Sequence, residues 1–137
     1  MNRYPAEQIY YEMDFLACPG NEMCSSLVAE VLSKAPRRVV DKVLKHCAIV
    51  MPNSDGAYFN SKYAKDSLIV LSERLLDMKS KEQHFTVLHE VAHFHLKHKD
   101  SMLSSMTKKQ QKRQEDKADE LANKWNRNRV KRQGKWL

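Results

Sequence analysis

Two histidines and a glutamate stand at a spacing that can hold and use a metal ion. The stretch from His89 to His93 reads HEVAH and matches the pattern H-E-x-x-H. Four residues make just over one helical turn, so His89 and His93 project from one helix face, with side chains roughly 6 Å apart. Glu90 is turned toward the edge of that face, where its carboxylate can accept a proton from metal-bound water. The pattern predicts two metal ligands and a general base.

A helix must position this motif, and the surrounding residues predict one that starts near Ser80. Apolar residues recur there at helical spacing: Phe85, Leu88, Ala92 and Leu96. We expect this apolar side to face the core, which would place the helix at the centre of the protein.

A catalytic zinc ion usually needs a third protein ligand and an open position for water. Metzincins place a third histidine six residues after the second, but Lys99 stands there, so that class is excluded. His95 and His98 lie far around the helix from His93, and we expect them on the solvent side or behind the ligands. The remaining donors are acids of the last predicted helix: Glu115, Asp116, Asp119 and Glu120.

Glu115 is the favoured third ligand among these acids. It shares a helix face with Ala118 and Ala122, whose small side chains would let this helix lie against the H-E-x-x-H helix. Asp119, one turn later, would then accept the second N–H of a liganding imidazole and hold the ring in place. The alternative is that these acids only balance charge within a basic helix.

The helices around the motif are short. We expect one helix through residues 27–32, with Ser25 or Ser26 as its N-cap, and another over 37–46. Thr107 and Gln110 have capping-box spacing and predict the start of the last helix.

Three short apolar runs predict strands at 48–51, 57–59 and 67–71, of which the first two would pair as a hairpin. A small antiparallel or mixed sheet of this kind needs helices on one face. We therefore expect a helix-rich α+β domain whose three-stranded sheet packs on the H-E-x-x-H helix.

Length and charge bound the remaining possibilities. The 137 residues fit one domain, which we place at 1–125, followed by a basic C-terminal tail at 126–137. No apolar run approaches the ~18 residues that span a bilayer, and the N-terminus lacks a secretory pattern. We expect a cytoplasmic protein with no membrane partner, whose three cysteines, without a CxxC pair, are reduced thiols.

The motif residues resemble a known family. Residues 85–98 read FTVLHEVAHFHLKH and are similar to the signature F-T-x-x-H-E-x-x-H-x-x-L-x-H of ImmA/IrrE-type metallopeptidases. Residues 115–122, EDKADELA, are similar to that family's helix E-x-x-A-[ND]-x-x-A. The resemblance extends over about residues 25–125 and is most specific around the motif.

This resemblance implies a zincin-like fold of the gluzincin type, with Zn²⁺ held by His89, His93 and Glu115 and with Glu90 as the general base. It also implies cleavage of a protein partner, such as a DNA-binding transcriptional repressor or an antitoxin-like protein. Such proteins are often encoded by phages and other mobile elements, which would place this one in the host-cell cytoplasm.

The sequence thus predicts a zinc metallopeptidase, and two alternatives stay open. One is a catalytically silent, metal-binding regulatory or interaction module. The other is a nucleic-acid binder, because residues 108–137 hold 11 basic and 4 acidic side chains, and Trp125 and Trp136 could stack on bases. Tyr58 and Tyr63 are candidates to stabilise an oxyanion, although packing explains both residues better.

Overall fold

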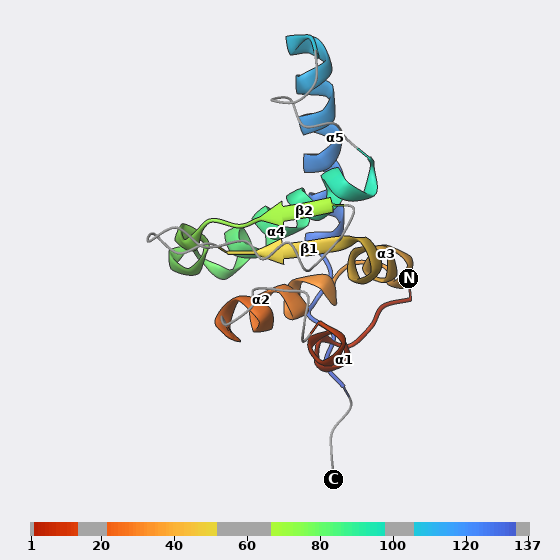
Figure 1. The fold of residues 1–137 in the computed structure, drawn as a ribbon, viewed down its shortest axis with the longest axis vertical. Helices are drawn as coiled ribbons and strands as arrows, with labels where there is room; N and C mark the ends of the chain where they lie inside the picture. The colour runs from red at the N-terminus through yellow and green to blue at the C-terminus, as the bar shows by residue number, and fades with distance from the viewer. Residues whose placement is uncertain (1, 14–21, 52–66, 98–105, 134–137) are drawn as a thin grey trace.

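Helices dominate the described part of this protein. The computed structural model describes residues 2–13, 22–51, 67–97 and 106–133. Along the chain these residues form α1 (Ala6–Glu12), α2 (Glu22–Leu32), α3 (Arg37–His46), β1 (Cys47–Val50), β2 (Ser67–Val70), the 3₁₀ helix η1 (Glu73–Asp77), α4 (Ser80–His95) and α5 (Lys108–Asn126) (Figure 1). None of the helices in these ranges is long and apolar enough to cross a lipid bilayer.

The helices before the sheet follow local signals, with one exception. α3 has the predicted bounds, since Pro36 precedes it in an extended conformation and Cys47 leaves the helix in an extended conformation. α2 begins at Glu22, so the prediction of Ser25 or Ser26 as N-cap is wrong. The fully buried Cys24 holds this first turn in the core, and an acid at its start suits the helix dipole.

The sheet in the described residues has two strands rather than three. β1 and β2 run parallel with Ile49 beside Ile69, and both of these side chains are buried. A purely antiparallel sheet is therefore excluded. The predicted strand at 57–59 lies outside the described residues, so a third strand is not confirmed. β2 contacts α4 and β1 contacts α3 (Figure 1), so the sheet rests on the helix that carries the motif.

α4 is the central helix, as the apolar spacing predicts. Val87, Leu88, Val91 and Ala92 are fully buried, and α4 contacts α2, α3, α5, β2 and η1. The expectation that Leu96 also faces the core is wrong. The helix ends at His95, Lys97 has a left-handed φ of 57°, and Leu96 is 37% exposed.

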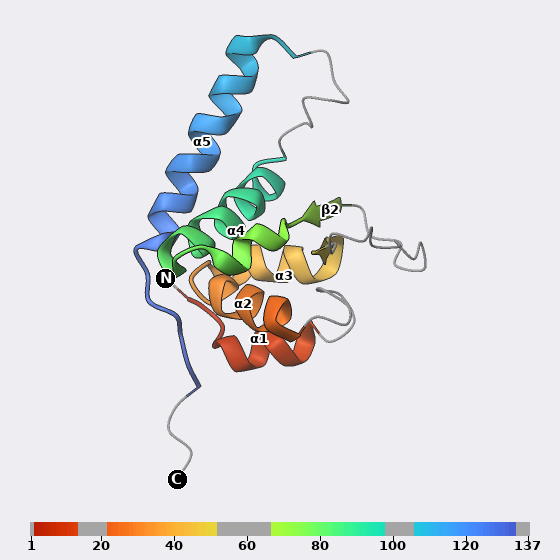
Figure 2. The same ribbon diagram turned by 90° about the vertical axis from the view of Figure 1, so that its left-hand side faces the viewer.

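α5 packs along α4 over its second half. The predicted capping box at Thr107 and Gln110 is present in full, and Ala118 and Ala122 are fully buried, which allows the two helices to approach closely. The first turns of α5 extend beyond the rest of the described structure (Figure 2). Trp125 is only 3% exposed, so it is not available to stack on nucleic-acid bases.

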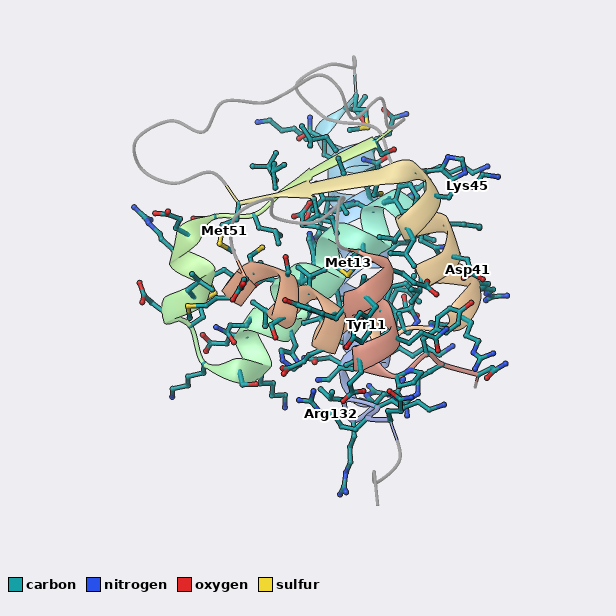
Figure 3. All side chains as sticks on the ribbon, turned by 60° about the horizontal axis from the view of Figure 1, so that its bottom comes forward. Tyr11, Met13, Asp41, Lys45, Met51 and Arg132 are labelled. Carbon is teal, nitrogen blue, oxygen red and sulfur yellow. The ribbon has the colours of Figure 1, made fainter. Side chains whose placement is uncertain are left out.

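The segment after α5 forms hydrogen bonds and ion pairs with α1, with α2 and with the turn that follows α2. The amide of Ala6 donates to the carbonyl of Lys131 at 2.8 Å, and the amide of Lys131 donates to Oγ of Ser33 at 3.0 Å. Arg132 lies beside α1 (Figure 3) and pairs with Glu30 at 2.9 Å and Glu7 at 3.7 Å. These contacts hold the end of α5, and thus its orientation on α4, against the N-terminal helices.

The cysteines do not all follow the prediction of reduced thiols. Cys47 is a buried thiol at the start of β1, as predicted. Cys24, by contrast, is disulfide-bonded, so the prediction is wrong for this residue. The odd number of cysteines and the lack of a CxxC pair gave no sign of a disulfide bond. Such a bond depends on which thiols the fold brings together, and the sequence pattern does not show this.

His84 makes the stability of the fold depend on pH. Its side chain is 5% exposed at the start of α4, where burial and then the charge of Lys34 lower its pKa, while Glu30 opposes them. The unfolded chain takes up a proton near pH 6.5 that the folded chain binds less readily. We therefore expect the free energy of unfolding to fall as the pH drops below about 6.5, by up to about 1.4 kcal/mol per pH unit.

Urea unfolding of the metal-free protein between pH 7.5 and 5.5 measures this dependence. His84→Leu should flatten the dependence, whereas His46→Leu, at the end of α3, should leave it in place. An equally steep dependence in His84→Leu would contradict the prediction.

Candidate metal centre

Three donor atoms from α4 and α5 meet at one point. The Nε2 atoms of His89 and His93 are 3.0 Å apart, and the Glu115 carboxylate contacts both, with Oε2 at 3.0 Å from His89 and Oε1 at 3.1 Å from His93. The two histidines share a face of α4, and Glu115 reaches them from the neighbouring α5. His89, His93 and Glu115 are thus positioned as a possible metal site.

The distances and the chemistry of these donors fit a cation. The ligand atoms of a tetrahedral zinc ion, at bonds of 2.0–2.2 Å, lie about 3.3 Å from one another. In this protein the two Nε2 atoms are 3.0 Å apart and each lies 3.0–3.1 Å from a different oxygen of Glu115, so a small rearrangement of the cluster would accommodate the ion. The side chains of His89, His93 and Glu115 are 16%, 20% and 58% exposed, so solvent can reach the site.

Asp119 contacts the far side of one imidazole. Its Oδ1 lies 2.8 Å from Nδ1 of His89, a buried atom with no hydrogen bond of good geometry in the described structure. A small rotation of the ring or the carboxylate aligns this pair. Such a contact selects the tautomer in which Nδ1 carries the hydrogen, and it leaves the Nε2 lone pair directed at the other donors.

The structure distinguishes among the four acids of α5. Glu115 and Asp119 face the histidine pair, whereas Asp116 and Glu120 are exposed and lie outside the cluster. Asp116 is rotated by 100° from Glu115 around the helix axis. The face of α5 that carries the buried Ala118 and Ala122 is turned toward α4, and this determines which acids point at the histidines.

Glu90 is placed beside the cluster rather than in it. Its side chain is partly buried on α4, and about 100° of helix rotation separates it from His89. Within the described ranges, no group donates a hydrogen bond to it or pairs with it. The carboxylate is therefore available to act as a base for a molecule bound at the donors.

The other sequence candidates do not join the site. His95 is partly buried and lies outside the donor cluster, and burial, then Lys42 and Arg38, lower its pKa. His98, Tyr58 and Tyr63 lie outside the described residues. Phe85 was predicted only as a core residue, but its ring centroid lies 6.0 Å from that of His89. Its position one turn before His89 was the signal for this contact.

Residues 82–135 match the Peptidase U49 family. This match supports a peptidase. The matched segment is less than half of the chain, but it runs from the first turn of α4 past the end of α5 and contains every donor of the cluster. It does not specifically support the ImmA/IrrE type that the motifs resemble. No curated protein and no solved structure matches the chain.

Proposed function

We propose that this protein is a zinc-dependent metallopeptidase of the gluzincin type that cleaves a peptide bond in a protein substrate. The observation that carries the proposal is the meeting of His89, His93 and Glu115 beside the Glu90 carboxylate, which has no partner among the described residues. The Peptidase U49 match over the same two helices supports the peptidase part of this proposal.

Zinc suits these donors better than other biological cations. Two imidazoles and one carboxylate are a ligand set of catalytic zinc sites, whereas magnesium and calcium prefer oxygen donors alone. The partial exposure of the donors is also typical of a catalytic rather than a closed structural site.

Each residue then has a defined role. His89, His93 and Glu115 bind the ion, and Asp119 holds the ring of His89. A bound zinc ion supplies Lewis acidity, which makes water a nucleophile near neutral pH and polarises the scissile carbonyl. Glu90 accepts the proton of the attacking water and passes it to the leaving amine nitrogen.

Asp119→Ala tests the role assigned to the contact at His89 Nδ1. Loss of the acceptor frees the ring to turn, and we expect zinc affinity to fall about 10- to 100-fold. Competition with a chromogenic chelator measures the affinity. Glu120→Ala removes the next carboxylate, which faces away from the cluster, and serves as the matched control. Equal zinc affinity in both variants would show that Asp119 only balances charge.

The resemblance to ImmA/IrrE peptidases motivates the choice of substrate. We propose a DNA-binding repressor or an antitoxin-like protein in the cytoplasm as the substrate class. Co-expression of candidate repressors with the parent protein or with Glu90→Gln tests this, because only the parent should produce fragments, and mass spectrometry locates the cut.

A silent metal-binding module that associates with nucleic acid is the alternative. The exposed basic start of α5 favours it, since Lys108, Lys109, Lys112 and Arg113 form no ion pair within the described ranges. The burial of Trp125 weakens it. Zinc retention without cleavage of any protein would favour this alternative over the peptidase.

A further inference from the structure

A surface depression of about 560 Å³ lies between the first turns of α4 and the last turns of α5. Its lining includes Met78 and Lys79, just before α4, Phe85 and Thr86 of α4, and Asn123 of α5. The depression and the metal centre thus lie along the same pair of helices.

The walls of this depression continue directly from the metal centre. Phe85 is one turn before His89, and their ring centroids are 6.0 Å apart. Asn123 is one turn after Asp119, which contacts the same histidine. Because a peptide advances about 3.3–3.6 Å per residue, a chain with its carbonyl at the donors would place an adjacent side chain in this depression.

The lining of the depression includes Thr86, on the same side of α4 as the proposed base. Thr86 is four residues before Glu90, so the two side chains lie one above the other on α4. A substrate that reaches Glu90 and the histidines therefore passes over Thr86 and Phe85.

The lining selects for apolar groups. The ring of Phe85, the thioether of Met78 and the methyl of Thr86 offer apolar contact, and the stems of Lys79 and Lys81 can extend it. The lysine ammonium groups outnumber the single lining carboxylate, Glu82, so a cationic side chain would meet net positive charge.

Asn126, which lines the depression from α5, is held in place by hydrogen bonds. Asn126 donates from Nδ2 to the carbonyl of Lys81 at 3.2 Å and accepts from Nζ of Lys34 at 2.9 Å. Lys34 itself is 8% exposed, so the amide cannot turn without leaving a buried ammonium group unpaired, which is costly. The part of the depression that Asn126 lines is therefore preformed.

From these observations we infer that the depression is the subsite for a large apolar side chain, of the Phe, Leu or Met class, next to the scissile bond. Arginine and lysine are disfavoured there. The inference rests on the proposed peptidase function and specifies which substrates that site accepts.

The test is the cleavage preference of the zinc-loaded full-length protein on a proteome-derived peptide library, read by mass spectrometry. We expect one position beside the cut to be enriched in Phe, Leu and Met and depleted of Lys and Arg. Thr86→Trp, which fills the depression, should reduce cleavage at large apolar residues at least 10-fold and shift the preference to Gly, Ala and Ser. Lys124→Trp, on the opposite face of α5, is the matched control and should keep the parent's preference.

The outcomes separate the two proposals. A shifted preference in Thr86→Trp with unchanged zinc content supports the subsite. Cleavage by the parent with no preference at either neighbouring position, or the same preference in Thr86→Trp, overturns the subsite and leaves the peptidase standing. If the zinc-loaded parent cuts no peptide or protein, the peptidase proposal fails and the subsite fails with it.

Discussion

Glu90→Gln should abolish proteolysis while leaving the metal in place. The amide has nearly the same shape as the carboxylate but cannot accept the proton of the attacking water, and loss of a general base costs about 10²- to 10⁴-fold in rate. Glu90 lies outside the donor cluster, so we expect close to one zinc ion per chain in parent and variant alike. Metal analysis by mass spectrometry and the cleavage rate of a co-expressed repressor measure the two quantities.

Glu120→Gln is the matched control for this experiment, because it makes the same chemical change on the exposed side of α5. It should retain both zinc and activity. Cleavage by Glu90→Gln at the parent's rate would rule out Glu90 as the base. Loss of zinc from Glu90→Gln would instead assign the carboxylate to metal binding.

Glu115→Ala should have the largest effect on metal binding. Removal of a residue behind the ligands typically lowers metal affinity 10- to 100-fold, so loss of a direct ligand should lower it by more than about 100-fold. In the parent, zinc at 100 times its dissociation constant stabilises the folded chain by about 2.7 kcal/mol. We expect most of this stabilisation to disappear in the variant, as measured by urea unfolding with and without zinc.

Asp116→Ala removes the neighbouring carboxylate, which is exposed and directed away from the histidines. Its zinc affinity should equal that of the parent. If Asp116→Ala loses zinc and Glu115→Ala keeps it, α5 is rotated on α4 differently from the arrangement described above, and the assignment of the third ligand is wrong.

Much of the local structure could be predicted because its causes lie within a few residues. Pro36 begins α3, Thr107 and Gln110 cap α5, and apolar spacing defines the buried side of α4. The errors occurred where distant contacts override such signals. α2 starts before Ser25 because Cys24 is buried by the rest of the fold, and β1 pairs in parallel with a strand that follows 16 residues later.

The sequence by itself determined that His89, Glu90 and His93 lie close together, because they fall within little more than one turn of one helix. For the third donor the sequence favoured Glu115 among four acids of α5, but spacing along the chain did not exclude the other three. Those acids occupy different directions around α5, and no pattern in the sequence specifies how α5 is rotated on α4. Burial of Ala118 and Ala122 against α4 sets that rotation. Tertiary packing therefore decided that Glu115 meets the histidines, because long-range burial, not spacing along the chain, orients one helix on another.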